Sequence, residues 1–111
     1  MEIINILKEL VKFNTIEDLE NKEIIEWIEQ YLLDYGFLCE KIIDKESKKI
    51  NLVAQIGKDH ILAFSGHLDT VNATEGWDLN PFDLKIDKYN IYGLGVCDMK
   101  GRDSCIFKSC E

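Results

Sequence analysis

The sequence has few basic residues, a single proline and no long hydrophobic run. Thirteen lysines and arginines stand against 21 aspartates and glutamates, which gives a formal net charge of −8 at pH 7. A chain this acidic is poorly suited to nucleic acid or to an anionic membrane surface. No apolar stretch approaches the roughly 20 residues that a transmembrane helix needs. We therefore expect neither nucleic acid nor a membrane as a partner.

Paired cysteines and an export signal are also lacking. The four cysteines, Cys39, Cys97, Cys105 and Cys110, show no C-x-x-C spacing. The amino terminus lacks the basic region and apolar core of a signal peptide, so reduced thiols and a cytoplasmic location are expected. With 111 residues, 46% hydrophobic and 31% charged, the chain has the composition of one globular domain at most.

Two amphipathic helices are expected in the first third of the chain. Apolar residues from Ile3 to Phe13 recur at helical spacing, as a helix with one buried face requires. A second helix is predicted over residues 21–35, with Gly36 just past its end, where glycine commonly terminates a helix. Each apolar stripe either packs on a sheet or binds a partner, and packing is the interpretation that we favour.

Five further segments have the pattern of strands. Phe37–Ile43 and Asn51–Ile56 predict two strands joined by a charged turn, and the apolar run at residues 61–64 predicts a third. Residues 83–87 and 89–94 can pair as a hairpin. Helices and strands in this order predict an α/β fold, with a mixed sheet and flanking helices.

Two motifs contain the candidate functional residues. In S-G-H-L-D-T-V (residues 65–71), His67 and Asp69 are two positions apart at the end of the third predicted strand. Their side chains then point to the same side of an extended chain, at the strand end where α/β sheets bind ligands. G-L-G-V-C-D-M-K-G (residues 93–101) adds Asp98 in a glycine-rich loop. Imidazole and carboxylates are a ligand set suited to Zn²⁺ or a similar divalent ion.

These motifs resemble those of the zinc hydrolases grouped around acetylornithine deacetylase, succinyl-diaminopimelate desuccinylase, aminoacylase and glutamate carboxypeptidase. The W-x-x-x-P-F of residues 77–82 and the N-L-V-A-Q-I-G of residues 51–57 also fit that family. The resemblance implies that residues 1–111 are the amino-terminal part of a three-layer α/β/α catalytic domain, without the lid or dimerisation domain. It implies metal-dependent hydrolysis of N-acyl amino acids or small peptides with two zinc ions (cobalt or manganese being possible substitutes), in proteins that are often homodimers.

The resemblance also assigns a role to each candidate residue. His67 becomes a metal ligand, Asp98 the carboxylate that bridges two metal ions, and Asp69 the catalytic carboxylate that orients His67. Each has a structural alternative: a histidine that merely ends a strand, an aspartate that caps the following helix, and a turn-forming aspartate, respectively. Two interpretations of Lys100 remain, a surface charge or a group that tunes the site.

The family resemblance weakens after Gly101. Relatives continue with a helix of small residues, whereas residues 102–111 show neither a helix cap nor a clean apolar period. Residues 100–111 can be back-translated so that deleting one base restores K-G-G-I-A-A-F-L-K-A-A, which suggests a shifted reading frame. The general-base glutamate and the remaining ligands of relatives fall beyond Glu111. We therefore expect a truncated, inactive relative of these amidohydrolases, the alternative being a small non-catalytic module that binds metal or a partner.

Overall fold

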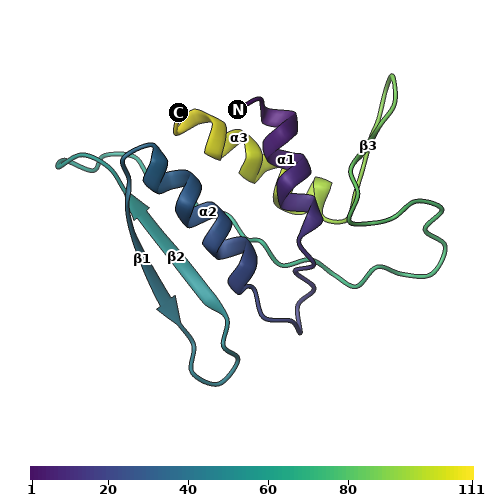
Figure 1. The fold of residues 1–111 in the computed structure, drawn as a ribbon, viewed down its shortest axis with the longest axis horizontal. Coiled ribbons are helices and arrows are strands. Elements are labelled where there is room, and N and C mark those ends of the chain that lie inside the picture. Colours follow the sequence, from purple (N-terminus) through teal and green to yellow (C-terminus); the bar gives the residue numbers. More distant parts are fainter.

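Three α-helices and two antiparallel two-stranded sheets make up the fold of residues 1–111 in the computed structural model (Figure 1). Helix α2 lies over the ribbon of β1 and β2, and α3 packs against α1. None of the helices has both the length and the apolar composition needed to span a membrane. In chain order, the elements are α1 (Ile3–Lys12), α2 (Lys22–Asp34), β1 (Leu38–Ile43), β2 (Ile50–Gln55), β3 (Lys85–Ile86), β4 (Ile91–Tyr92), the irregular turn η1 (Val96–Lys100) and α3 (Gly101–Ser109).

The two predicted amino-terminal helices are confirmed, and their apolar stripes form the core. Ile6 and Leu10 of α1 pack with Ile24 and Ile28 of α2, all of them buried. Full burial of one such side chain stabilises a fold by roughly 1.5–3 kcal/mol. Gly36 follows α2 with φ of +84°, a left-handed conformation that glycine adopts without steric cost. The stripes therefore serve packing, as the sequence indicated.

The first predicted strand pair is also confirmed, as the antiparallel ribbon of β1 and β2. Its register runs from Leu38 opposite Gln55 to Ile43 opposite Ile50. Ile50 is buried and packs in the core beneath α2, while alternate residues of β2 are exposed. The second hairpin exists too, but only β3 and β4, of two residues each, pair within it.

The prediction of a third strand at residues 61–64 is wrong. Residues 60–69 contain no turn or bend, but residues 61–64 form no backbone–backbone hydrogen bond with any neighbour. Ile61 is 97% exposed and Leu62 73%. A strand is defined by its pairing, and no other segment of the chain lies alongside this apolar run to pair with it. The expected mixed sheet is consequently absent, and the ribbons β1–β2 and β3–β4 are separate sheets.

Helix α3 contains a buried carboxyl group. The sequence indicated no coherent element here, yet residues 101–109 are helical, without a side-chain cap. Asp103 is only 3% exposed, and its Oδ2 atom has no hydrogen-bond partner. Its Oδ1 atom would lie 2.1 Å from a Cβ at Gly66, so any larger residue there would have to displace the Asp103 carboxyl group. Burial raises the pKa of Asp103 to about 6, although the positive charges of His67 and Lys100 counteract that rise.

The substitution Asp103→Asn should stabilise the protein at neutral pH. A carboxyl whose pKa is raised in the folded state destabilises that state above its folded pKa, and the effect disappears as pH falls from about 6 to about 4. Removal of the charge should raise the free energy of unfolding at pH 7 by up to about 3 kcal/mol. It should also flatten the pH dependence between about pH 4 and 6. Urea unfolding followed by tryptophan fluorescence measures both effects, and Asp78→Asn, at an exposed position, is the matched control. An unaltered pH profile would contradict this account.

Candidate functional site

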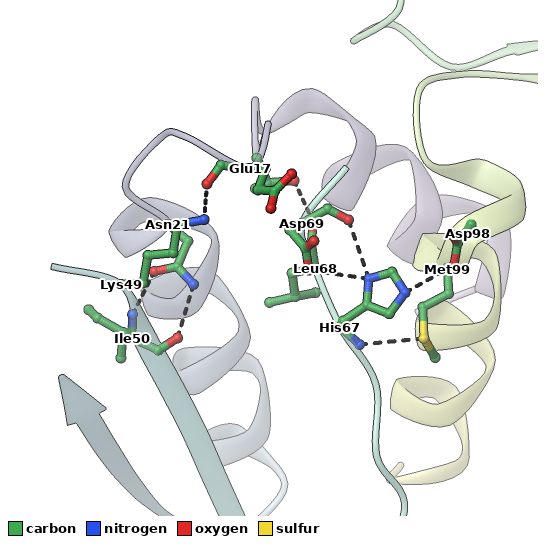
Figure 2. Close-up of polar contacts among 10 residues, drawn as sticks. Glu17, Asn21, Lys49, Ile50, His67, Leu68, Asp69, Asp98 and Met99 are labelled. Carbon is green, nitrogen blue, oxygen red and sulfur yellow. Dashed lines mark hydrogen bonds and ion pairs between the residues drawn. The ribbon is translucent and has the colours of Figure 1, made fainter. Parts of the chain in front are cut away.

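His67, Asp69 and Asp98 meet at one place in the structure (Figure 2). The Nε2 atom of His67 lies 2.9 Å from Oδ1 of Asp98, and its Nδ1 atom lies 3.4 Å from Oδ1 of Asp69. The carbonyl oxygen of Asp69 is 3.3 Å from the same Nδ1. Nε2 is thus hydrogen-bonded to a carboxylate of one motif, and Nδ1 to the backbone carbonyl of Asp69 in the other, whose carboxylate lies close by. The expected convergence of the motifs is present even though the strand that was expected to precede His67 is not.

The loop after α1 positions the histidine motif. Thr70 N donates to Thr15 O at 2.9 Å and Glu17 N donates to Thr70 O at 3.1 Å, which forms a parallel bridge between Ile16 and Thr70. The hydroxyl of Thr15 also donates to the carbonyl oxygen of Leu68. These bonds fix the backbone on the carboxyl side of His67.

The second motif is positioned by Gly95 and Lys100. Gly95 has φ of +79°, and a Cβ there would lie 2.6 Å from Cγ2 of Thr70, so glycine lets the Asp98 loop approach the histidine segment. Lys100 is 1% exposed and its Nζ atom donates to the carbonyl oxygen of Phe13 at 3.0 Å. Burial lowers the pKa of Lys100 to about 8, and the charge of Asp103 opposes that change. Lys100 is therefore not a surface charge but a buried tie between η1 and the end of α1.

The capping alternative for Asp98 is wrong. Helix α3 begins at Gly101, Lys100 occupies the N-cap position, and no side chain caps the helix. Asp98 lies earlier, in η1, with non-helical backbone angles of φ −137° and ψ 93°. Its carboxylate is directed to His67 instead of to the free N–H groups of α3.

A small cleft beside His67 contains one carboxylate that no motif marks. The cleft has a volume of about 240 Å³, and Glu17 lines it together with His67, Asp69 and Asp98. Glu17 belongs to the loop after α1 and is brought here by its bond to Thr70. Because this bond joins distant parts of the chain, sequence pattern had no means to reveal Glu17.

The surroundings of His67 favour its protonated form in the metal-free protein. Partial burial lowers the pKa of His67, but the hydrogen bond to Asp98 and the negative charges of Asp69 and Asp98 raise it, and the net pKa lies above the usual value. The side chain is 45% exposed, so solvent and ions reach the ring. A cation that replaced the proton would meet the same negative surroundings.

The donor atoms at this place fit a divalent metal ion in type. Imidazole nitrogen and carboxylate oxygen are both ligands that Zn²⁺ takes, usually four in a tetrahedral site. His67 Nε2 and Asp98 Oδ1 could supply two, and Asp69 lies next to the other ring nitrogen, where carboxylates are often found behind metal-bound histidines. No group of three or more histidine, cysteine, aspartate or glutamate side chains is arranged to hold a metal ion. The two side chains would supply half of the ligands that a tetrahedral site needs.

Comparison with solved structures defines the fold class. The crystal structure of human carnosine dipeptidase 1 matches with a TM-score of 0.82, over 97% of this chain and 27% of that chain. At 20% sequence identity, this likeness shows the fold alone. The chain has the fold of one part of a dipeptidase structure.

Sequence comparison defines the family. Residues 63–111, which include both motifs, match the model of Peptidase family M20/M25/M40. A probable succinyl-diaminopimelate desuccinylase of Staphylococcus epidermidis is 37% identical over 101 residues, which are 88% of this chain and 24% of that protein. The acetylornithine deacetylase of Vibrio atlanticus is 35% identical over 96 residues, which are 85% of this chain and 25% of that protein. The chain belongs to the peptidase M20 family, as its motifs indicated, and spans about a quarter of the length of these relatives.

Replacing Asp98 by asparagine should lower the pKa of His67 in metal-free protein. The substitution removes a negative charge 2.9 Å from Nε2, which stabilises the imidazolium form. The imidazole proton shifts in NMR spectra, recorded across the pH range, give the midpoint directly. Asp34→Asn, at the carboxyl end of α2, is the matched control and should leave the midpoint unchanged. An equal midpoint in Asp98→Asn and the parent would show that the contact is not made in solution.

Proposed function

We propose that this chain supplies part of the metal site of an M20-type amidohydrolase or peptidase. The observation that carries the proposal is His67, whose two ring nitrogens contact carboxylates from two separate family motifs. The relatives are named as desuccinylases and deacetylases, which supports an N-acyl amino acid or small peptide as the substrate class. The reaction is hydrolysis of the amide bond in such a molecule.

Each of the three residues has a defined task in this proposal. His67 through Nε2 and Asp98 through its carboxylate hold the metal ion, zinc being first choice and cobalt or manganese the alternatives. Asp98 would be the residue that serves both ions of a two-metal site, as the family resemblance implies. The carbonyl oxygen of Asp69 accepts a hydrogen bond from Nδ1–H of His67, with the Asp69 carboxylate beside it, which leaves the lone pair of Nε2 free for the metal. The bound ion supplies acidity to a water molecule and polarises the scissile carbonyl.

The described residues do not form a complete catalytic centre. Two proposed metal ligands are present, and no third side chain joins them to complete a site. In this proposal the 111-residue chain alone is inactive, and hydrolysis requires ligands and a general base from further polypeptide. The four cysteines are free thiols, which supports a reducing, cytoplasmic setting as part of the proposal.

Zinc binding by the isolated chain should be weak and should depend on His67. With two ligands in place of four, we expect a dissociation constant above about 1 μM, or a binding free energy less favourable than about −8 kcal/mol. Complete structural zinc sites reach about 10–16 kcal/mol. Titration calorimetry should show this weak binding in the parent and in His60→Ala, which alters the other histidine, and none in His67→Ala. Tighter binding that is lost in His67→Ala would establish a complete metal site and contradict the half-site.

The isolated chain should not hydrolyse N-acetylornithine, N-succinyl-diaminopimelate or dipeptides above background, with or without added Zn²⁺. The physical reason is the missing third ligand, since two side chains alone would not hold an ion that activates water. Release of free amine, assayed with an amine-reactive dye, measures the reaction. Turnover that survives repurification, vanishes with a chelator and is absent from His67→Ala would overturn this expectation.

A further inference from the structure

The loop between α1 and α2, residues 13–21, bonds to two separate parts of the molecule. Residues 15–17 of the loop bond to residues 68–70 of the histidine motif, as described above. Glu17 and Asn21 also bond to the start of β2, 29 to 32 residues further along the chain. Figure 2 shows Glu17 between Lys49 on one side and the segment of His67 on the other. The loop therefore joins the β1–β2 ribbon to the candidate site.

Asn21 is the first of two attachments between the loop and the ribbon. Its Nδ2 atom donates to Ile50 O at 2.9 Å, and its Oδ1 atom accepts from Ile50 N at 2.8 Å (Figure 2). An amide side chain carries both a donor and an acceptor, as a peptide group does, so Asn21 bonds to Ile50 as a neighbouring strand would. Ile50 is 7% exposed, and buried backbone groups need hydrogen-bond partners. Asn21 supplies a partner for both of them.

Asn21 makes this contact instead of capping α2. It is the residue just before the helix, where asparagine is a preferred N-cap because its side chain can accept from a free N–H group of the first turn. No such side-chain bond is present. Only the carbonyl oxygen of Asn21 serves the helix, by accepting from Ile25 N. The side chain is thus committed to Ile50 and the start of α2 stays uncapped, which indicates a role for Asn21 outside the helix.

Lys49 is the second attachment, and it acts on Glu17. The C=O group of Glu17 accepts from the Nζ atom of Lys49, and its N–H group donates to Thr70 O at 3.1 Å. Lys49 itself is fixed on the ribbon, because its C=O group accepts from Asp44 N at 2.9 Å. One residue of the loop thus has one backbone group bonded to the ribbon and the other to the histidine motif. A displacement of Glu17 would therefore displace Thr70 as well.

The histidine motif has little other backbone support. Residues 61–64, which lead into it, form no backbone–backbone hydrogen bond. His67 N contacts Met99 Sδ at 3.4 Å, but the motif that contains Met99 is itself attached to the same loop through Lys100. The position of one motif relative to the other thus depends on how the loop is held.

We propose that Asn21 and Lys49 are positioning residues for the candidate metal site. They hold the loop against β2, and the loop holds Thr70 and with it the backbone that follows His67. Coupling between distant groups is carried by contiguous hydrogen bonds and packed elements, and the hydrogen bonds from Ile50 through the loop to the histidine motif are continuous. The importance of the two residues for metal binding rests on the function proposed above, whereas the coupling itself needs neither metal nor activity.

Met99 provides a spectroscopic reporter of the contact between the two motifs. The chain has two methionines, Met1 and Met99, so carbon-13 labelling of methionine methyl groups gives two resonances. The Met99 methyl carbon would lie 3.3 Å from a Cβ at Gly66, and its resonance therefore depends on how the motifs meet. Met1 precedes α1, at the end opposite the loop, and serves as an internal control. A substitution that only lowers stability leaves both resonances of the folded protein unshifted.

The first test compares Asn21→Ala with Asn21→Asp in the metal-free 111-residue chain. Alanine removes both bonds to Ile50, whereas aspartate keeps the acceptor and loses the donor. In Asn21→Ala, we expect amide exchange at Glu17 and Thr70 to quicken at least about tenfold and the Met99 methyl resonance to shift. Asn21→Asp should produce smaller effects in the same direction. Asn72→Ala, at an exposed position, is the matched control and should alter neither measurement.

The second test uses Lys49→Met, which keeps the aliphatic part of the side chain, loses the donor and leaves the core untouched. It should also quicken exchange at Thr70 and shift the Met99 resonance, while Lys45→Met, at an exposed position of the same turn, should not. Circular dichroism verifies that each variant folds. Parent values in both Asn21→Ala and Lys49→Met would overturn the proposal, and so would faster exchange without a shift of Met99, which would make the role merely structural. Zinc binding that His67→Ala leaves unaltered would contradict the proposed function instead, not the coupling.

Discussion

The loop that follows α1 holds both chemical motifs in place. Thr15 and Glu17 bond to Thr70 near the end of the histidine motif, and Phe13 accepts the hydrogen bond of buried Lys100 from the aspartate motif. Two segments some thirty residues apart are thereby attached to the same short stretch of backbone. The contact of His67 with Asp98 depends on these attachments, because neither motif belongs to a sheet that could fix its position.

Two charged side chains are buried near the loop that follows α1, and burial shifts their pKa values in opposite directions. Lys100 and Asp103 are both buried, and burial lowers the pKa of the lysine and raises that of the aspartate. Each charge partly relieves the other, but neither pairs with the other in a salt bridge within 4.0 Å. Such groups weaken a fold unless hydrogen bonds satisfy them. The helix α3 thus packs against α1 with a face that is only partly apolar.

Part of the apolar surface of the chain lies outside its hydrophobic core and is exposed. The hydrophobic core consists of one cluster around α1 and α2 and a smaller one around Leu7, Val11 and Leu84. Ile61, Leu62 and Phe64 remain exposed, and the chain spans about a quarter of the relatives that it matches. Apolar surface of this extent is typical of a face that another polypeptide covers.

The sequence by itself determined the elements whose cause is local. Helical spacing of apolar residues predicted α1 and α2, a glycine free to adopt positive φ marked the end of α2, and alternation predicted β1 and β2. The motifs around His67 and Asp98 identified the family and the residues that meet in the candidate site. Only the tertiary structure decided that residues 61–64 form no strand, that Lys100 is buried and that Glu17 lines the cleft. The reason is physical: a strand exists only beside a neighbour, and burial and proximity arise from contacts between residues far apart in the chain, which no local pattern encodes.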